Sequence, residues 1–499
     1  MMPRYKHQER TNELLQQFPF FALIMEQGTG KSRPILDDWI RRNLDSWPVD
    51  LVVLAPKGCY MNWIGTPQEP GEIDKWVSTE MRDQIYVAAW RSGASQAQQR
   101  ELNNLLHARG PRFLAMNIEA LNRKGPARIY LENFIRNHRV IGVIDESTTI
   151  CHEEAARTEY LLDIANQFYA RRILSGLVAP ESPLDLYTQY HYLDWRIIGQ
   201  KSFYGFKNRY AIMEQMDFRK AAERAFAEAY PDRAPKYRKP QVVVGFRNLE
   251  ELNAKIMKYS YRVLKENVLD LPPKIYQFWD VDMPMEQIVI YGEMRDMAYA
   301  RLGSNPEEYT TASQKLDQLG KLQHILCGHV RNEMGELRDI PEMRTDAVVE
   351  ILHNHSGKAI IWAPYPRALQ KIVTRLRKEF GEDSTVGFWG QHSLDERLEA
   401  RARIQNDDLC RFIVSNQSVG KFGNTWTACN LVIYYANSFD NEDRQQSEDR
   451  PHRIGQTKSV TYIDLRCRGT LDERLIQVLR KKINMSSMLQ GDEFRKWLI

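Results

Sequence analysis

The order of apolar and polar residues predicts two series of buried strands separated by helices. Most of the apolar runs are short and continuous, and many end at polar residues or glycine. Runs of this kind are typical of strands in a parallel sheet that helices cover on both faces. They lie at residues 20–24, 51–55, 113–116, 140–144 and 172–174, and again at 359–363, 412–414, 431–435 and 461–465. We therefore predict an α/β protein with two such halves, in which ligands bind at the carboxyl ends of the strands.

The pattern changes between the two series. Aromatic and basic residues are mixed there with helical segments such as 219–230 and a short strand at 242–244. Pro272 and Pro273 then interrupt the chain, because two prolines cannot continue a helix. Helical patterns return at residues 285–300, 313–326, 366–380 and 471–483. We divide the chain into a first lobe at 1–200, a helical and basic insertion with the inter-lobe linker at 201–275, a helical protrusion of the second lobe at 276–340, and that lobe at 341–499.

The first predicted strand continues into a glycine-containing loop and then a helix, which is the context that a phosphate-binding loop requires. Gly28 and Gly30 allow a sharp turn that directs amide N–H groups at phosphate oxygens. Lys31 would reach the β- and γ-phosphates, and the Ser32 hydroxyl would hold Mg²⁺. Met25 stands where the motif has its first glycine. On this stretch alone, a chance turn in an ordinary α/β protein is the alternative.

Two further groups of residues suit ATP hydrolysis. The fourth predicted strand ends at Asp145 and Glu146. An aspartate there can hold Mg²⁺, and the adjacent glutamate can take the proton of an attacking water. In the second half, Arg450 and Arg453 are three residues apart and share one side of a helical turn, which suits a polyphosphate. The alternatives are a strand that merely ends in two acids, and a surface arginine pair balanced by the acidic residues before it.

Length, charge and cysteine content limit the number of domains, the partners and the cellular compartment that we expect. A chain of 499 residues is too long for one hydrophobic core, and its net charge of +4 permits nucleic-acid binding without requiring it. The basic residues between 196 and 239 suit a solvated helical surface and a backbone-binding face equally. The six cysteines form no CxxC pair, so we expect free thiols. No apolar run could span a bilayer, and the polar start does not resemble a signal peptide. We expect a cytoplasmic protein, in the host cytoplasm if viral, with no membrane partner.

Taken together, these stretches resemble the Swi/Snf-like branch of superfamily two helicases, the DNA-translocating ATPases. The most specific stretch, residues 446–456, matches the family pattern Gln-Ala-x-x-Arg-x-x-Arg-Ile-Gly-Gln except at Ser447. The resemblance runs from Gln8 to about Leu479 and is to compact bacterial and phage members. It implies two RecA-like lobes with parallel β-sheets flanked by helices, and helical insertions between them.

The resemblance also implies a role for each motif residue. Gln8 would read the adenine. Leu177 and Val178 stand where the family has Thr-Pro after Ser-Gly, and Ser147-Thr148 stand where many members have Ala-His. The implied ATP-binding residues are Gln8, Gly28, Thr29, Gly30, Lys31 and Ser32. The implied Mg²⁺ ligands are Ser32 and Asp145, and the implied catalytic residues are Glu146, Arg450 and Arg453. The candidate nucleic-acid contacts are Lys57, Asn117, Ser415, Asn416 and Lys421.

The function that we predict is an ATP-dependent DNA translocase. Its two lobes would close on ATP and Mg²⁺, hydrolyse ATP to ADP and phosphate, and move along duplex DNA held by its phosphates without reading sequence. A strand-separating helicase in replication or repair, a nucleic-acid-binding scaffold with weak ATP turnover and a small-molecule kinase are the alternatives. We expect DNA as the partner and a monomeric protein.

Overall fold

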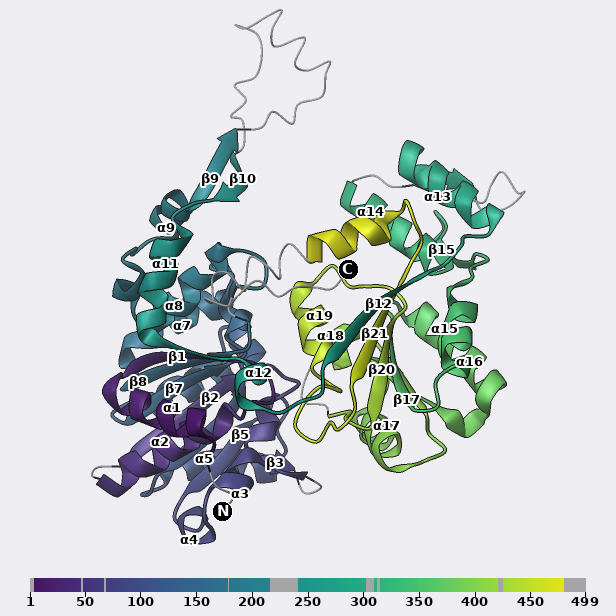
Figure 1. The fold of residues 1–499 in the computed structure, drawn as a ribbon. Coiled ribbons are helices and arrows are strands. Elements are labelled where there is room, and N and C mark those ends of the chain that lie inside the picture. Colours follow the sequence, from purple (N-terminus) through teal and green to yellow (C-terminus); the bar gives the residue numbers. More distant parts are fainter. Residues whose placement is uncertain are drawn as a thin grey trace, which may run out of the picture.

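Two α/β lobes joined by a linker make up the protein (Figure 1). The computed structural model describes residues 4–45, 48–66, 69–177, 179–215, 241–301, 309–311, 315–420 and 425–479. The predicted helix at 219–230 lies outside these residues. Within them, no helix is both long and apolar enough to cross a membrane. The two predicted parallel sheets are confirmed, one in each lobe.

Lobe 1 contains a seven-stranded sheet in the order β11-β1-β8-β7-β2-β6-β5, in which every neighbouring pair is parallel. Alternate residues of its strands enter two separate cores, one on each face of the sheet. This explains why the central strands are apolar along most of their length. The strands are β1 (Phe20–Met25), β2 (Val49–Ala55), β5 (Tyr86–Trp90), β6 (Arg112–Asn117), β7 (Arg139–Asp145), β8 (Ala170–Ser175) and β11 (Ser260–Val263).

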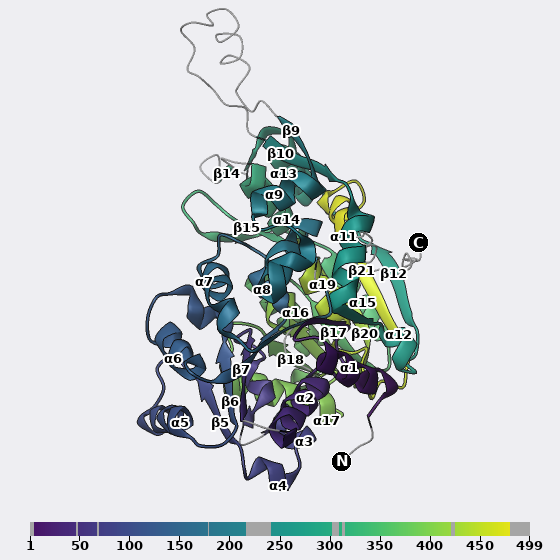
Figure 2. The ribbon, with the colours of Figure 1, turned by 90° about the vertical axis from the view of Figure 1, so that its left-hand side faces the viewer.

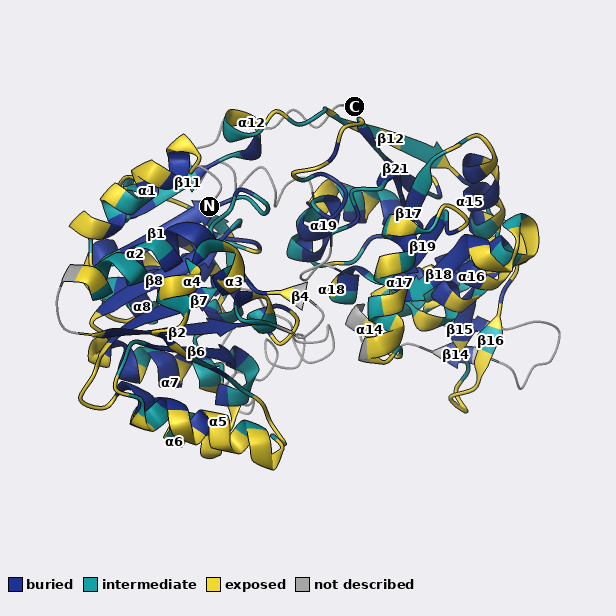
Figure 3. Cartoon of the chain, turned by 90° about the horizontal axis from the view of Figure 1, so that it is seen from below, coloured by how far each residue is buried: buried dark blue, intermediate teal, exposed yellow. Residues whose placement is uncertain are grey.

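Helices cover both faces of this sheet, whose central strands are buried (Figure 3). Apolar side chains of α2, among them Trp39, pack on one face, whereas α6, α7 and α8 pack on the other. The helices are α1 (Lys6–Gln17), α2 (Ser32–Asp45), α3 (Glu72–Trp76), α4 (Thr79–Arg82), α5 (Gln96–His107), α6 (Pro126–Ile135), α7 (Ala156–Ile164), α8 (Leu186–Ile198), α9 (Phe203–Tyr210), α11 (Leu249–Ile256) and α12 (Lys265–Val268).

Lobe 2 repeats the design with a six-stranded parallel sheet in the order β12-β21-β20-β17-β19-β18. Its strands are β12 (Lys274–Asp280), β17 (Lys358–Trp362), β18 (Thr385–Phe388), β19 (Phe412–Ser415), β20 (Cys429–Tyr434) and β21 (Val460–Arg466). Its helices are α13 (Met285–Met297), α14 (Lys315–Leu326), α15 (Arg344–His353), α16 (Pro366–Phe380), α17 (Leu394–Asn406), α18 (Gln417–Gly420) and α19 (Asn441–Glu448).

The boundary between the lobes differs from the predicted one. The hairpin of β9 (Ala211–Gln215) and β10 (Gln241–Phe246) projects away from the sheets (Figures 1 and 2). The chain then returns, and β11 pairs with β1 at the edge of the first sheet. The next strand, β12, already belongs to the second sheet. The segment predicted as insertion and linker, 201–275, therefore contains a strand of lobe 1, and the connection between the sheets is residues 264–273.

Short antiparallel pairs complete the described structure. They are β3 (Gly65–Thr66) with β4 (Glu69–Pro70), β13 (Tyr299–Arg301) with β14 (Tyr309–Thr311), and β15 (His329–Arg331) with β16 (Leu337–Asp339). The predicted helix at 285–300 ends three residues early, because Ala298 takes a left-handed conformation at its end.

Candidate nucleotide site between the lobes

The loop between β1 and α2 has the shape of a phosphate-binding loop. Gly28 and Gly30 both have φ of +83°, which glycine adopts without strain. The Thr29 hydroxyl and main-chain N–H both donate to the Glu26 carbonyl, at 2.7 and 3.3 Å. The turn is therefore fixed by its own hydrogen bonds, and Ser32 begins α2 directly behind it.

Helix α1 braces this loop. Gln8 is buried, and its Nε2 donates to the Gly30 carbonyl at 3.2 Å. A side chain at Gly30 would place its Cβ 2.5 Å from the same nitrogen. His7 contacts the Thr29 carbonyl through Nε2 at 2.8 Å, a contact that the sequence did not indicate. The structure thus brings Gln8 to the loop, where its amide contacts the main chain.

The acidic pair lies at the end of β7, beside the loop. Glu146 has φ of +50°, a conformation that is uncommon outside glycine and frequent at functional sites. Its Oε1 lies 3.8 Å from Lys31 Nζ. Asp145 Oδ2 accepts a hydrogen bond from Trp63 Nε1 at 2.9 Å. Burial, with the nearby charge of Glu146, raises the pKa of Asp145 to about 6.

These residues fit a phosphate chain with Mg²⁺. The Lys31 ammonium is buried, and among the described residues it has no hydrogen-bond partner. Asp145 lies beside a second carboxylate, Glu146, and burial disfavours the charge of Asp145, so a cation there would favour its ionised form. Ser32 and Asp145 would hold the metal, and Lys31 would contact phosphate oxygens.

Both arginines of lobe 2 reach this loop. Arg450 follows α19, and its Nε donates to the Gln446 carbonyl at 2.9 Å. Its Nη2 donates to Oε1 of Gln27 in the loop. Arg453 packs over Gly28, where a Cβ added to the glycine would meet the Arg453 Cβ at 3.4 Å. Burial lowers the pKa of Arg450 to about 10, so the guanidinium is still charged at neutral pH. The positively charged arginines of lobe 2 thus contact the phosphate-binding loop of lobe 1.

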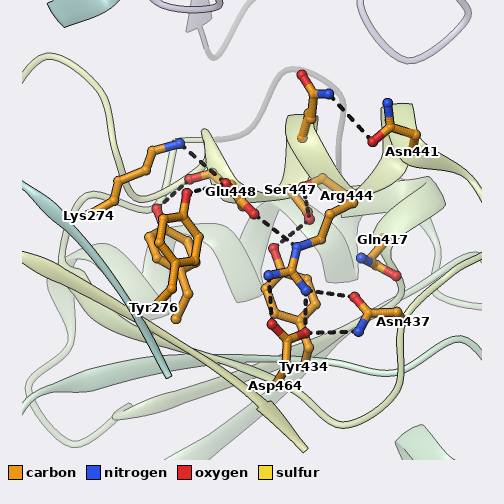
Figure 4. A network of polar contacts seen from close by, with 12 residues as sticks. Lys274, Tyr276, Gln417, Tyr434, Asn437, Asn441, Arg444, Ser447, Glu448 and Asp464 are labelled. Atoms are coloured by element: carbon orange, nitrogen blue, oxygen red, sulfur yellow. Dashed lines mark hydrogen bonds and ion pairs between the residues drawn. The ribbon is translucent and has the colours of Figure 1, made fainter. Parts of the chain in front are cut away.

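A buried polar network holds the helix that precedes these arginines (Figure 4). The Arg444 guanidinium donates to both carboxylate oxygens of Asp464 in β21 and to Glu448 Oε1 at 2.9 Å. It also donates to Asn437 Oδ1 at 2.6 Å and lies 3.5 Å from the ring centroid of Tyr434. Helix α19 is therefore fixed to the sheet, and with it the position of Arg450.

The linker also joins the two motifs. The main-chain N–H of Lys265 donates to Glu26 Oε2 in the loop at 2.8 Å. Its ammonium lies 2.7 Å from Asp449 Oδ1 and donates to the His452 carbonyl at 3.0 Å. Burial lowers the pKa of Lys265 to about 7. Sequence reasoning missed this residue, because an isolated lysine in a linker matches no motif.

A second set of contacts between the lobes involves Glu442 of α19. Thr148 donates to Glu442 Oε1 at 3.0 Å, and Gln446 Nε2 donates to the same oxygen at 2.6 Å. A pocket lies in the cleft between the lobes. Its lining comes from both lobes: Glu26, Gln27, Glu146, Gly176, Leu177, Lys274, Gln445, Gln446, Glu448 and Asp449.

The candidate nucleic-acid residues are brought together only in part. Lys57 is exposed after β2, and Asn117 ends the neighbouring β6, so these two share one edge of the first sheet. Ser415 is fully buried, and its hydroxyl donates to the Phe388 carbonyl, so its side chain does not reach the surface. Asn416 Nδ2 donates to Ser418 Oγ at 2.7 Å. Lys421 and Val178 lie outside the described residues.

Comparison with known proteins shows what this chain is similar to. Residues 343–455 match the model of the helicase conserved C-terminal domain. The chain is 25% identical over 457 residues to the human DNA annealing helicase and endonuclease ZRANB3, covering 90% of this chain and 37% of that protein. It is 26% identical over 364 residues to a Caenorhabditis elegans SWI/SNF-related matrix-associated actin-dependent regulator of chromatin subfamily A-like protein 1 homolog, covering 71% and 46%.

Among solved structures, the Sulfolobus solfataricus SWI2/SNF2 ATPase core in complex with dsDNA matches 98% of this chain and 94% of its own, with a TM-score of 0.39 and 19% identity. The chain spans less than two fifths of the length of ZRANB3. The relatives that match most of its length are helicase-type or SWI/SNF-related proteins by their names, and the matched model covers its C-terminal part. The chain is therefore similar to the Swi/Snf-like branch of superfamily two helicases.

Proposed function

We propose that this chain is a DNA-dependent ATPase that moves along duplex DNA. The observation that carries the proposal is the contact of Arg450 and Arg453, both from lobe 2, with the phosphate loop of lobe 1. A nucleotide in that loop would then touch both lobes, so that hydrolysis could change how they sit together. Closure around a ligand at such a cleft is a common way to convert binding into movement.

Each group of cleft residues has a separate role in ATP hydrolysis. The backbone of the Gly28–Gly30 turn and the Lys31 ammonium bind the phosphates. Glu146 accepts a proton from the water whose oxygen attacks the γ-phosphorus, while the bond from that phosphorus to the β–γ bridging oxygen breaks and ADP leaves. Arg450 and Arg453 stabilise the charge on the transferred phosphoryl group. Mg²⁺, when bound through Ser32 and Asp145, neutralises phosphate charge and orients the phosphates.

DNA is the track that the relatives favour, since ZRANB3 is by its name a DNA annealing helicase. The candidate contacts Lys57, Asn117 and Asn416 would bind the phosphate backbone, which carries no sequence information. We therefore propose nearly sequence-independent, salt-dependent binding. Movement on intact duplex would displace a triplex-forming strand, whereas a strand-separating helicase would release one strand of a forked duplex.

The test is steady-state ATP hydrolysis with duplex DNA, single-stranded DNA, RNA and no nucleic acid. Duplex DNA should stimulate the rate most. Lys31→Ala and Glu146→Gln should each lower the stimulated rate by about 100-fold or more, since they remove phosphate binding and the proton acceptor. Lys258→Ala, which removes an exposed lysine of lobe 1, should leave the rate unchanged. Equal rates in the Lys31 and Glu146 variants and the wild type would refute the proposal.

A further inference from the structure

Gln27 connects the acidic residue of lobe 1 to the arginine of lobe 2. It lies in the phosphate loop, at a position where the motif accepts any residue, so the sequence assigned it no role. Its Oε1 accepts from Arg450 Nη2, and its Nε2 lies 3.4 Å from Glu146 Oε1, to which it donates. One side chain thus contacts the two groups that must act together on the γ-phosphate.

The chemistry of the amide suits this place. A guanidinium needs an acceptor, and a carboxylate needs a donor; a glutamine side chain carries one of each. Glutamate at position 27 would still accept from Arg450, but its charge would repel Glu146. Methionine would fill a similar volume and could form neither hydrogen bond. The orientation of the amide, with oxygen toward Arg450 and nitrogen toward Glu146, follows the charges on either side.

Neighbouring contacts hold the residues on both sides of Gln27 in place. Glu26, directly before it, holds the linker through the Lys265 main chain at 2.8 Å. On the other side, Arg450 is held within lobe 2 through its Nε and the Gln446 carbonyl. Gln27 therefore joins two parts that are each anchored in their own lobe. Its contact determines how the guanidinium stands relative to Glu146 across the cleft.

We propose that Gln27 is a positioning residue. It holds the Arg450 and Glu146 side chains, which lie on opposite sides of the cleft, in the relative position that ATP hydrolysis needs, an inference that rests on the proposed function. It acts through these two residues and does not itself exchange a proton or bind the metal. Its loss should therefore lower the turnover rate more than ATP affinity, because binding by the glycines and Lys31 is left intact.

The experiment measures kcat and KM for ATP at saturating duplex DNA. We expect Gln27→Met to lower kcat about tenfold or more with KM within about threefold, as is usual when a catalytic group is misplaced rather than lost. Gln27→Glu should be at least as impaired, because it repels Glu146. Gln16→Met, which makes the same substitution at an exposed glutamine of α1, should match the wild type.

A double-mutant cycle separates positioning from a general structural effect. If Gln27 acts through Arg450, adding Gln27→Met to Arg450→Ala should reduce the rate little further, whereas independent effects would multiply. A wild-type kcat in Gln27→Met, multiplicative losses in the double mutant, or faster DNA-free turnover in Gln27→Met would each overturn the inference. A wild-type protein without DNA-stimulated hydrolysis would instead overturn the proposed function.

Discussion

Replacing Arg444 with methionine should strongly destabilise lobe 2, because the guanidinium is the centre of a buried charge network. The Arg444 side chain is only 3% exposed and donates to Asp464, Glu448 and Asn437. Methionine keeps most of the apolar stem, so packing changes little. The loss is that of the positive charge beside two buried carboxylates.

The remaining partners set the size of the effect. Without the guanidinium, Asp464 keeps a hydrogen bond from Asn437 Nδ2 at 2.8 Å. Glu448 keeps one from the Tyr276 hydroxyl at 2.8 Å and an ion pair with Lys274 at 3.4 Å. Removing one partner of a buried ion pair costs about 3 to 5 kcal/mol, and these surviving contacts favour the lower end, about 3 kcal/mol.

A second arginine provides the matched control. Arg466 lies in β21, where its side chain is 25% exposed and pairs with Asp280 at 2.6 Å. Ion pairs that solvent reaches contribute about 0 to 1 kcal/mol, so Arg466→Met should change the free energy of unfolding by less than about 1 kcal/mol. Hydrogen exchange at β20 and β21 amides in increasing urea measures the free energy of opening lobe 2. Equal effects of the two substitutions would refute this account of the network.

Three further changes have clear expected outcomes. Trp63→Phe removes the indole donor to Asp145 and should raise the Mg²⁺ concentration for half-maximal ATP hydrolysis by about tenfold, as loss of a group that orients a metal ligand commonly does; an unchanged Mg²⁺ titration would contradict this. Burial lowers the pKa of His452 from 6.5 to about 4. The unfolded chain therefore binds a proton between these pH values that the folded protein does not, and stability should fall as the pH drops through that window. The His452→Gln side chain can still donate to the Pro272 carbonyl. In urea unfolding, the free energy of unfolding of this variant should fall less between pH 7 and pH 5 than that of the wild type. Lys57→Ala should weaken DNA binding and reduce by about one the slope of log affinity against log salt, measured by fluorescence anisotropy; an unchanged slope would remove this lysine from the DNA contacts.

The fold was predictable where strands are buried on both faces. The nine strands predicted for the two α/β halves correspond to β1, β2, β6, β7, β8, β17, β19, β20 and β21, and the short strand predicted at 242–244 lies in β10. Within the two parallel sheets, the strands that sequence reasoning missed are the four edge strands, β5, β11, β12 and β18. An edge strand is partly exposed and so need not be apolar throughout, as the alternating exposure of β12 shows. Missing β11 and β12 also misplaced the boundary between the lobes.

The site was predictable where its residues form local motifs. Gly28, Lys31 and Asp145 are recognised by spacing within a strand and a loop, and the structure brings them together. Gln27 and Trp63 were not predicted, because their roles depend on partners 423 and 82 residues away. Neither residue type at those positions indicates such a contact. In a site assembled between two lobes, the sequence therefore predicts the residues of local motifs and does not predict the contacts between distant residues.

The central claim is that lobe 2 completes an ATP site in lobe 1, and one measurement tests it most directly. ATP hydrolysis by the wild type and by Arg450→Ala should be compared with and without duplex DNA, with ATP binding measured alongside. We predict DNA-stimulated hydrolysis in the wild type and, in the variant, a loss of about 100-fold or more with ATP still bound, as for other arginines that stabilise phosphoryl transfer from a second domain. An Arg450→Ala protein that hydrolyses ATP at the wild-type rate would contradict the account.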